Sequence, residues 1–152
     1  MRVDEFLSEH RIPFERISHD PVFTSNDLAQ NLHISGKEVA KAVLLRSFKG
    51  YFLAVLPASC KVDLGLMSQE VGDEQVAMAS EDEMEQLFPD CDRGAIPPFG
   101  SLYRLPTLVD EALAEDDRIV FEAQCHDQAI RMKFRDFDAM EHPRHGHFTC
   151  HN

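Results

Sequence analysis

The first forty residues alternate between helical and extended patterns of hydrophobic and polar positions. Residues 3–9 fit a short helix, and residues 13–17 are typical of an extended segment. Thr24 or Ser25 can cap a second helix that runs to about Leu32, because a hydroxyl group accepts a hydrogen bond from a free N–H in the first turn. The pattern therefore predicts two short helices with an extended segment between them.

The middle of the chain contains the clearest strand-pairing signal. Two hydrophobic runs, residues 40–46 and 51–57, flank a turn at Lys49-Gly50 and predict a β-hairpin. Residues 80–83 read Ser-Glu-Asp-Glu, a capping box that predicts a helix to residue 87. Further elements are expected as an amphipathic segment at 63–71, strands at 75–79, 105–109, 118–123 and 129–134, and part of a closing helix at 137–140.

This irregular order of strands and helices predicts the fold class. A hairpin argues against a purely parallel sheet, so a mixed sheet flanked by helices, an α+β fold, is favoured. At 152 residues the chain fits one domain, and a domain of that size buries about two-thirds of the surface that its unfolded chain exposes. We find no repeat or linker and expect a single domain over residues 1–152.

The charge is strongly acidic, with 15 Lys and Arg against 27 Asp and Glu. Proteins that bind nucleic acid through many phosphates usually have a basic face, which this composition does not indicate. A modest patch such as Lys37, Lys41 and Arg46 would still suffice for a partner that is held through few phosphates.

We expect a cytoplasmic protein with reduced thiols. No run approaches the roughly 20 apolar residues of a membrane span, and Asp4 and Glu5 interrupt the region where a signal peptide is apolar. The four cysteines are scattered without a Cys-x-x-Cys pair, so neither a disulfide framework nor a zinc site is indicated.

Three segments are candidates for a functional site. Residues 94–100 read Gly-Ala-Ile-Pro-Pro-Phe-Gly, and such a run predicts either a surface turn or an outward-facing loop whose few backbone N–H groups hold an oxyanion or a phosphate. Lys41 begins an apolar run and shares a face with Val43 and Leu45 if the run is a strand; it either extends to water or serves a site. His126 lies in a polar turn, where it is either solvated or functional.

In this order the segments resemble the YbaK-like family of aminoacyl-tRNA deacylases, which also supplies the editing domain of bacterial prolyl-tRNA synthetases. Lys41 falls at the position of the family's pocket lysine, and Gly94 to Pro98 fit its Gly-x-x-x-Pro loop. His126 lies where the synthetase-inserted branch has a histidine, and residues 19–24 resemble the approach to the first pocket helix. The resemblance covers nearly the whole chain.

The chain departs from the family at two places. Gln124-Cys125 stand where many relatives have a glycine before the histidine turn, and Ala42 stands where some alanine-specific relatives have an asparagine. The resemblance therefore implies the fold more firmly than the edited amino acid, and alanine, serine, cysteine and threonine all stay open.

The resemblance implies a curved, mostly antiparallel sheet that approaches a barrel, with the pocket at one side. It also implies hydrolysis of a mischarged aminoacyl-tRNA ester by positioned water, without a covalent intermediate or a cofactor. The implied catalytic residues are Lys41, Gly94, Ala95 and Ile96, and the implied substrate-binding residues are Phe23, Thr24, Pro97, Pro98, Phe99, Gly100 and His126.

The expected partner is the 3′ end of an aminoacyl-tRNA, with an aminoacyl-tRNA synthetase as a second candidate and neither membrane nor DNA. No nucleophile motif is present, which agrees with catalysis by positioning and charge stabilisation. Two alternatives stay open: a non-catalytic tRNA- or synthetase-binding module of the same fold, and a small-molecule hydrolase.

The last eleven residues, from about residue 142, contain four of the eight histidines and one cysteine. These are acceptable zinc or nickel ligands, but proline and glycine interrupt them and no second ligand cluster exists at a defined spacing. We therefore expect a mobile tail and no metal site.

Overall fold

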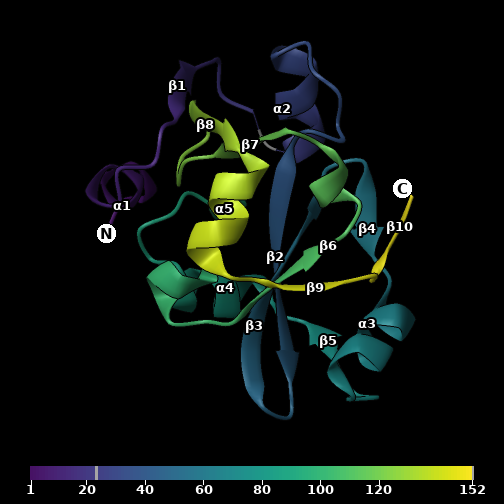
Figure 1. Cartoon of the computed structure of the whole chain (residues 1–152). Coiled ribbons are helices and arrows are strands. Elements are labelled where there is room, and N and C mark those ends of the chain that lie inside the picture. Colours follow the sequence, from purple (N-terminus) through teal and green to yellow (C-terminus); the bar gives the residue numbers. More distant parts are fainter. Residues whose placement is uncertain (23, 152) are drawn as a thin grey trace.

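The computed structural model describes residues 1–22 and 24–151, and it arranges strands of three sheets among short helices (Figure 1). The α-helices are α1 (Val3–Glu9), α2 (Ser25–Asn31), α3 (Leu64–Val71), α4 (Glu81–Leu87) and α5 (Phe134–Glu141). The strands are β1 (Glu15–Ser18), β2 (Ala40–Ser47), β3 (Gly50–Pro57), β4 (Cys60–Val62), β5 (Ala77–Met78), β6 (Thr107–Asp110), β7 (Arg118–Glu122), β8 (Gln128–Lys133), β9 (Arg144–Gly146) and β10 (Thr149–His151).

The predicted hairpin forms the centre of the largest sheet. β2 and β3 pair antiparallel from Ala40 opposite Pro57 to Ser47 opposite Gly50, and Gly50 takes a φ of 115° in the turn. The sheet order is β5-β2-β3-β6-β9, in which β3, β6 and β9 run parallel. A mixed sheet, as the sequence predicts, is confirmed.

A second sheet, β1-β8-β7, is antiparallel and meets the first sheet at one parallel bridge between Val39 and Val120. Alternate residues of β7 enter two different cores. Ile119 and Phe121 pack with α1 and α5, whereas Val120 packs with α2. The three-stranded sheet is therefore covered by helices on both faces, with α2 on the side of Val39 and Val120.

The predicted caps are also present. The Thr24 hydroxyl accepts from the Asp27 amide at 3.0 Å at the start of α2, and Ser80 and Glu83 form the reciprocal capping box of α4. These caps fix the chain direction at the entrance to each helix.

The C-terminal residues differ from the predicted mobile tail. β9 extends the large sheet beside β6, and β10 pairs with β4. Between these strands Phe148 is fully buried among residues of α3 and β3, and its amide donates to the Asp110 carboxylate at 2.8 Å. One buried phenylalanine and two backbone pairings hold a segment that the histidine-rich composition makes look like an unstructured tail.

Among the described residues the three sheets do not close into a barrel, so the barrel-like detail of the resemblance stays a prediction. None of the helices in that part of the chain is long and apolar enough to cross a bilayer.

Candidate functional site

Lys41 lies on β2 opposite Leu56 of β3, with regular pairing on either side. Side chains alternate along a strand, so Lys41 shares its face with Val43 and Leu45 as predicted, and also with Val39. Val43 and Leu45 pack towards α3 and Val39 packs towards α2, so Lys41 lies where these two cores adjoin.

The electrostatic state of Lys41 is unusual for a half-buried lysine. Burial lowers the pKa of its ammonium group, and the Cys60 thiol opposes this effect. Among the described residues no carboxylate oxygen lies within 4.0 Å of its Nζ. Buried cations are normally paired with a carboxylate. Lys41 has no such partner among the described residues, so its positive charge is available to an anionic or carbonyl ligand.

Glu122, the last residue of β7, is a candidate site residue that the sequence did not single out. Val39 and Val120 form the bridge between the two sheets, and Lys41 and Glu122 each follow it by two residues. Alternation therefore directs both side chains to the α2 side of the bridge. Glu122 is only 6% exposed, and burial raises the pKa of its carboxyl to about 7.

His126 binds this region to two other segments through backbone and side-chain contacts. Its Nδ1 lies 3.5 Å from Glu122 Oε2, and its amide donates to Asp92 Oδ2 at 3.3 Å. Its carbonyl accepts from the Val22 amide at 3.2 Å, which brings the segment before α2 against the turn. The structure thus groups His126 with Glu122, Asp92 and the approach to α2.

The approach to α2 contains two predicted substrate-binding residues. Thr24 is exposed and its hydroxyl is engaged as the helix cap, so its polar group is already committed. Phe23 lies outside the described residues, and its predicted role stays a prediction.

The Gly94 loop begins beside this group. Asp92 donates its amide to the Gln124 carbonyl at 2.8 Å and accepts the Ala95 amide at 3.0 Å, so the loop is tied to the end of β7. Gly94 is exposed with a φ of 82°, a conformation that favours glycine. Among the described residues neither the Gly94 nor the Ile96 amide has an acceptor, whereas the Ala95 amide is used internally.

The sequence predicts that the loop faces outward, but the structure shows that the rest of the loop faces inward. Residues 95–100 are all buried: Ile96 packs against Leu44 and Phe88, and Phe99 enters the core of α1 and α5. The apolar side chains of Ile96 and Phe99 pack into the protein, and Pro97 and Pro98, which lie between them, are buried as a result. The glycine/proline composition of this run predicts a surface loop, whereas its apolar residues favour burial.

Gly100 is required by packing. A Cβ atom at this position would lie 2.4 Å from Thr107 Oγ1, the atom that accepts the Gly100 amide at 3.0 Å. The two glycines of the loop therefore serve different purposes, a left-handed backbone at Gly94 and a close approach at Gly100.

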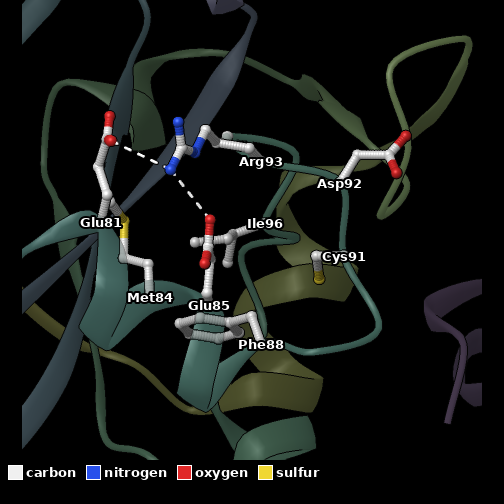
Figure 2. A pocket seen from close by; sticks show the side chains of 9 residues that line it. Glu81, Met84, Glu85, Phe88, Cys91, Asp92, Arg93 and Ile96 are labelled. Carbon is white, nitrogen blue, oxygen red and sulfur yellow. Dashed lines mark hydrogen bonds and ion pairs between the residues drawn. The ribbon is translucent and has the colours of Figure 1, made fainter.

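A cavity of about 340 Å³ adjoins the loop on the α4 side (Figure 2). Arg93 lines it and forms ion pairs with Glu81 and Glu85, and Phe88 and Ile96 give it apolar walls. The Asp92 carboxylate points away from this cavity, in agreement with its bond to the His126 amide (Figure 2).

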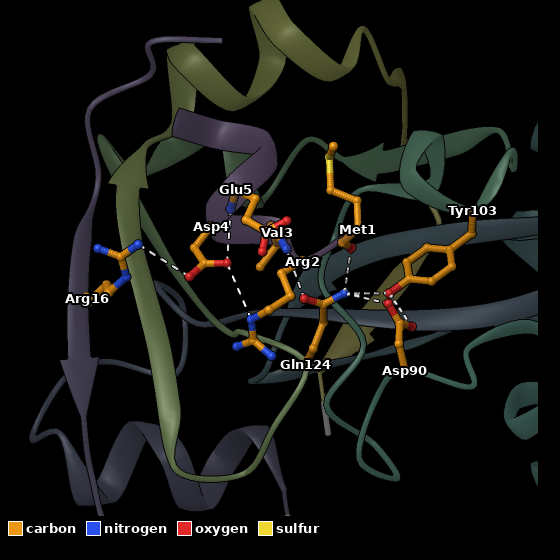
Figure 3. A network of polar contacts seen from close by, with 9 residues as sticks. All are labelled: Met1, Arg2, Val3, Asp4, Glu5, Arg16, Asp90, Tyr103 and Gln124. Carbon is orange, nitrogen blue, oxygen red and sulfur yellow. Dashed lines mark hydrogen bonds and ion pairs between the residues drawn. The ribbon is translucent and has the colours of Figure 1, made fainter. Parts of the chain in front are cut away.

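Gln124 explains how the turn tolerates a residue other than glycine. It takes a left-handed φ of 71°, and its buried side chain connects four segments (Figure 3). Its Oε1 accepts from the Val3 amide at 2.9 Å, and its Nε2 donates to Asp90 at 3.1 Å and to the Tyr103 hydroxyl at 2.8 Å. The side-chain hydrogen bonds offset the backbone strain and fix the turn that carries His126.

The cysteines offer no activated nucleophile near the loop. Burial raises the pKa of Cys91 to about 12, and its sulfur contacts the Tyr103 hydroxyl at 3.1 Å. In the part of the chain that the structure describes, no group of three His, Cys, Asp or Glu side chains is arranged to hold a metal ion.

Sequence reasoning brought together Lys41, Gly94 and His126 but missed Glu122 and Asp92. An acidic residue at the end of an apolar strand could have indicated such a site, because a charged side chain is rarely buried there without a partner. Its relation to Lys41 depends on the bridge between two sheets, which no local pattern predicts.

Comparisons with known proteins agree with these findings. Residues 19–139 match the family model of the aminoacyl-tRNA editing domain. The chain is 31% identical over 99 residues to the prolyl-tRNA editing protein ProX of Acetoanaerobium sticklandii, a match that covers 63% of this chain and 59% of that protein. The matched region thus spans less than two-thirds of this relative.

Solved structures share the fold. The hypothetical protein APE2540 has a TM-score of 0.89 at 17% identity, with 97% of this chain and 99% of that chain covered. A crystal structure described as a candidate trans-editing enzyme for prolyl-tRNA synthetase has a TM-score of 0.80 at 19% identity, with 90% and 87% covered. Similarity at these identities concerns the fold alone. The family match, in contrast, spans most of the sequence and includes Lys41, Gly94 and His126, and the chain belongs to the aminoacyl-tRNA editing domain family.

Proposed function

We propose that this protein hydrolyses the ester bond of mischarged aminoacyl-tRNA in trans, as a single editing domain that works in the cytoplasm. The observation that carries the proposal is the half-buried, unneutralised charge of Lys41 inside a family of editing domains. An aminoacyl ester at the 3′ end of tRNA offers what such a lysine binds, a carbonyl oxygen that becomes negative and a nearby phosphate.

The hydrolysis needs positioning more than a strong nucleophile. The aminoacyl ester is already activated, so an oriented water molecule and stabilised oxyanion can supply most of the rate enhancement. We assign Lys41 to the phosphate or the ester carbonyl, and the acceptor-free amides of Gly94 and Ile96 to the developing oxyanion or the water. Ala95 contributes to this loop by the bond that holds Asp92 in place.

His126 is the substrate-binding residue that these contacts favour most. It lies between Glu122 and Asp92, next to the approach to α2. Thr24 and, by the sequence resemblance alone, Phe23 are the further residues that we propose to contact the amino acid. We assign Pro97, Pro98, Phe99 and Gly100 to the support of the loop, because their burial prevents them from contacting the substrate without rearrangement.

The proposed substrate is tRNA for proline that carries a wrong amino acid. The similarity to ProX, a prolyl-tRNA editing protein, supports this choice of tRNA. The acidic charge of −12 disfavours extensive phosphate contacts, so recognition of the terminal nucleotides, with or without a synthetase as partner, fits the surface better.

The test is release of labelled amino acid from a panel of mischarged tRNAs, including tRNA for proline that carries alanine or cysteine. We expect selective hydrolysis by the parent and a loss of about 10²–10³-fold in Lys41→Ala, the effect of removing one oxyanion-stabilising group. Lys61→Ala removes an exposed lysine of β4 and serves as the control with unchanged activity.

Equal activity of the parent and Lys41→Ala would overturn the assigned mechanism. A folded parent that hydrolyses no member of the panel but binds tRNA would indicate the non-catalytic binding module. Cleavage of free aminoacyl esters at the rate of tRNA esters would indicate a small-molecule hydrolase.

A further inference from the structure

The α2 side of the two-sheet junction contains two buried acceptor atoms that the fold leaves unsatisfied. Glu122 Oε1 and His19 Nε2 are both buried, and neither has a hydrogen-bond partner among residues 1–22 and 24–151. Unpaired buried polar atoms are rare in folded proteins, because each one costs free energy of desolvation without return. These atoms are therefore candidates to bind a polar group of a ligand.

The placement of Glu122 follows from the β7 register. Val120 belongs to the core under α2, and Glu122 lies two residues further on the same face. Its other oxygen, Oε2, is 3.5 Å from His126 Nδ1, a distance of weak pairing. The residue is only 6% exposed, yet Oε1 of its carboxylate has no hydrogen-bond partner among the described residues.

His19 occupies the equivalent face beyond β1. Ile17 packs under α2, and His19 follows it by two residues, with its amide bound to the Asp127 carbonyl at 3.0 Å. Its Nδ1 lies 2.7 Å from the Asp20 carbonyl oxygen, which can only accept, so Nδ1 carries the hydrogen. In the neutral ring Nε2 is therefore a second acceptor on this face.

Two acceptors of which one is anionic select a ligand that donates several hydrogen bonds and carries positive charge. An ammonium group has three N–H donors and no acceptor, which matches this demand. Lys41 cannot supply it, because its Nζ has no carboxylate within 4.0 Å among the described residues. The same face thus presents the Lys41 ammonium, which has no carboxylate partner, and a carboxyl with one unused oxygen.

We propose that the Glu122 carboxylate binds the α-ammonium group of the aminoacyl ester, and so restricts the enzyme to substrates with a free α-amine. This inference rests on the proposed function, because it identifies which part of an aminoacyl-tRNA reaches Glu122. A substrate bound in this way would place its ammonium at Glu122 and its carbonyl or phosphate towards Lys41. An N-acylated aminoacyl ester, which has no charge at this nitrogen, would be a poor substrate.

The first experiment compares each hydrolysed aminoacyl-tRNA with its N-acetyl derivative in the parent and in Glu122→Gln. We expect N-acetylation to lower kcat/KM of the parent by about 10- to 100-fold, as expected when a hydrogen bond to a buried charge is lost. Glu122→Gln should lose a similar factor on the free amine and show little further loss on acetylation. Glu74→Gln, an exposed carboxylate after α3, is the control that should retain the parental ratio.

A second readout separates this inference from the proposed hydrolysis. A stable amide analogue, 3′-alanylamino-3′-deoxyadenosine, and its des-amino counterpart are titrated into parent and Glu122→Gln by calorimetry in two buffers of different ionisation enthalpy. The parent should bind the amine-bearing analogue at least about 10-fold more tightly than the counterpart and release more protons near pH 7 than the variant.

The outcomes are distinguishable. A parent that binds the amine selectively but hydrolyses no ester retains the ammonium site and overturns the proposed function. A parent that hydrolyses esters while Glu122→Gln keeps the full acetylation penalty overturns the ammonium site, and equal loss on free and acetylated substrates would indicate that Glu122 orients His126 instead. Absence of both hydrolysis and binding overturns both proposals.

Discussion

Glu122 and Asp110 are both buried acidic residues at the last position of a strand, 6% and 3% exposed. Asp110, at the end of β6, accepts from the Ala112 amide at 2.9 Å and from the Phe148 amide at 2.8 Å, one for each oxygen. Glu122, at the end of β7, has only the distant His126 contact, and its Oε1 has no partner among the described residues. Burial alone therefore does not distinguish a structural carboxylate from a candidate functional one. The difference is whether each of its oxygens accepts a hydrogen bond within the fold.

The contacts of Asp110 and Glu122 have different structural consequences. Asp110 holds the C-terminal strands to the large sheet, because its partner Phe148 lies between β9 and β10. Glu122 has one contact of 3.5 Å to His126 and fastens no other segment, and its burial is costly unless it serves the proposed site. The comparison predicts opposite consequences for stability when each carboxylate is removed.

The largest effect is expected at Asp110. Asp110→Ala leaves the buried Phe148 amide and the part-buried Ala112 amide without an acceptor, and each unsatisfied group costs about 1–3 kcal/mol, so the free energy of unfolding should fall by about 2–6 kcal/mol. Urea denaturation measures the change, with Glu74→Ala as an exposed control that should shift stability by less than about 0.5 kcal/mol. A loss below about 1 kcal/mol would show that the C-terminal strands do not depend on this carboxylate.

The sequence predicted local features well because local interactions set them. The hairpin around Lys49-Gly50, the Thr24 cap and the Ser80 capping box each depend on residues within a few positions of one another, and all three are confirmed. Lys41 was placed on the correct face for the same reason, since strand alternation needs no knowledge of the rest of the fold.

Pairings distant in sequence could not be predicted. β4 and β10 have three residues each and are separated by more than eighty positions, so neither carries a periodic signal. The bridge between Val39 and Val120 is of the same kind, and it is the contact that sets Lys41 and Glu122 on one side of the protein. The composition of residues 94–100 misled for a different reason, because Ile96 and Phe99 outweigh the glycines and prolines around them.

A second prediction sharpens the contrast at Glu122 itself. The folded-state pKa of this carboxyl is about 7, above its ordinary 4.5, so the folded protein keeps the proton that the unfolded chain loses as pH rises between these values. Stability should therefore fall from about pH 4.5 to 7, by up to about 3 kcal/mol, and stay lowered above pH 7. The titratable groups that face Glu122 are His126 and Asp92, with His19 on the same face.

Glu122→Gln should remove this pH dependence and raise the melting temperature at pH 8. Melting curves of parent and variant between pH 4.5 and 8 measure the difference, which should be small at the acidic end and grow towards neutral pH. Parallel curves across this range would mean that the carboxyl is satisfied by a partner in solution, and the contrast with Asp110 would disappear.

The smallest effect is expected at a third buried polar side chain, Gln124. Its polar atoms have hydrogen-bond partners, as those of Asp110 have, and it lies two residues after Glu122 in the chain. Its φ of 71° is strained for any residue except glycine, and its side-chain hydrogen bonds offset that strain. Gln124→Ala and Gln124→Gly lose the same hydrogen bonds, but only glycine relieves the backbone. We expect both variants to unfold at lower urea concentration than the parent, with the glycine variant the more stable of the two by about 1 kcal/mol. If the alanine and glycine variants are equally stable, the strain lies elsewhere in the turn. If the parent is no more stable than either variant, the hydrogen bonds to Val3 and Tyr103 make no net contribution to stability.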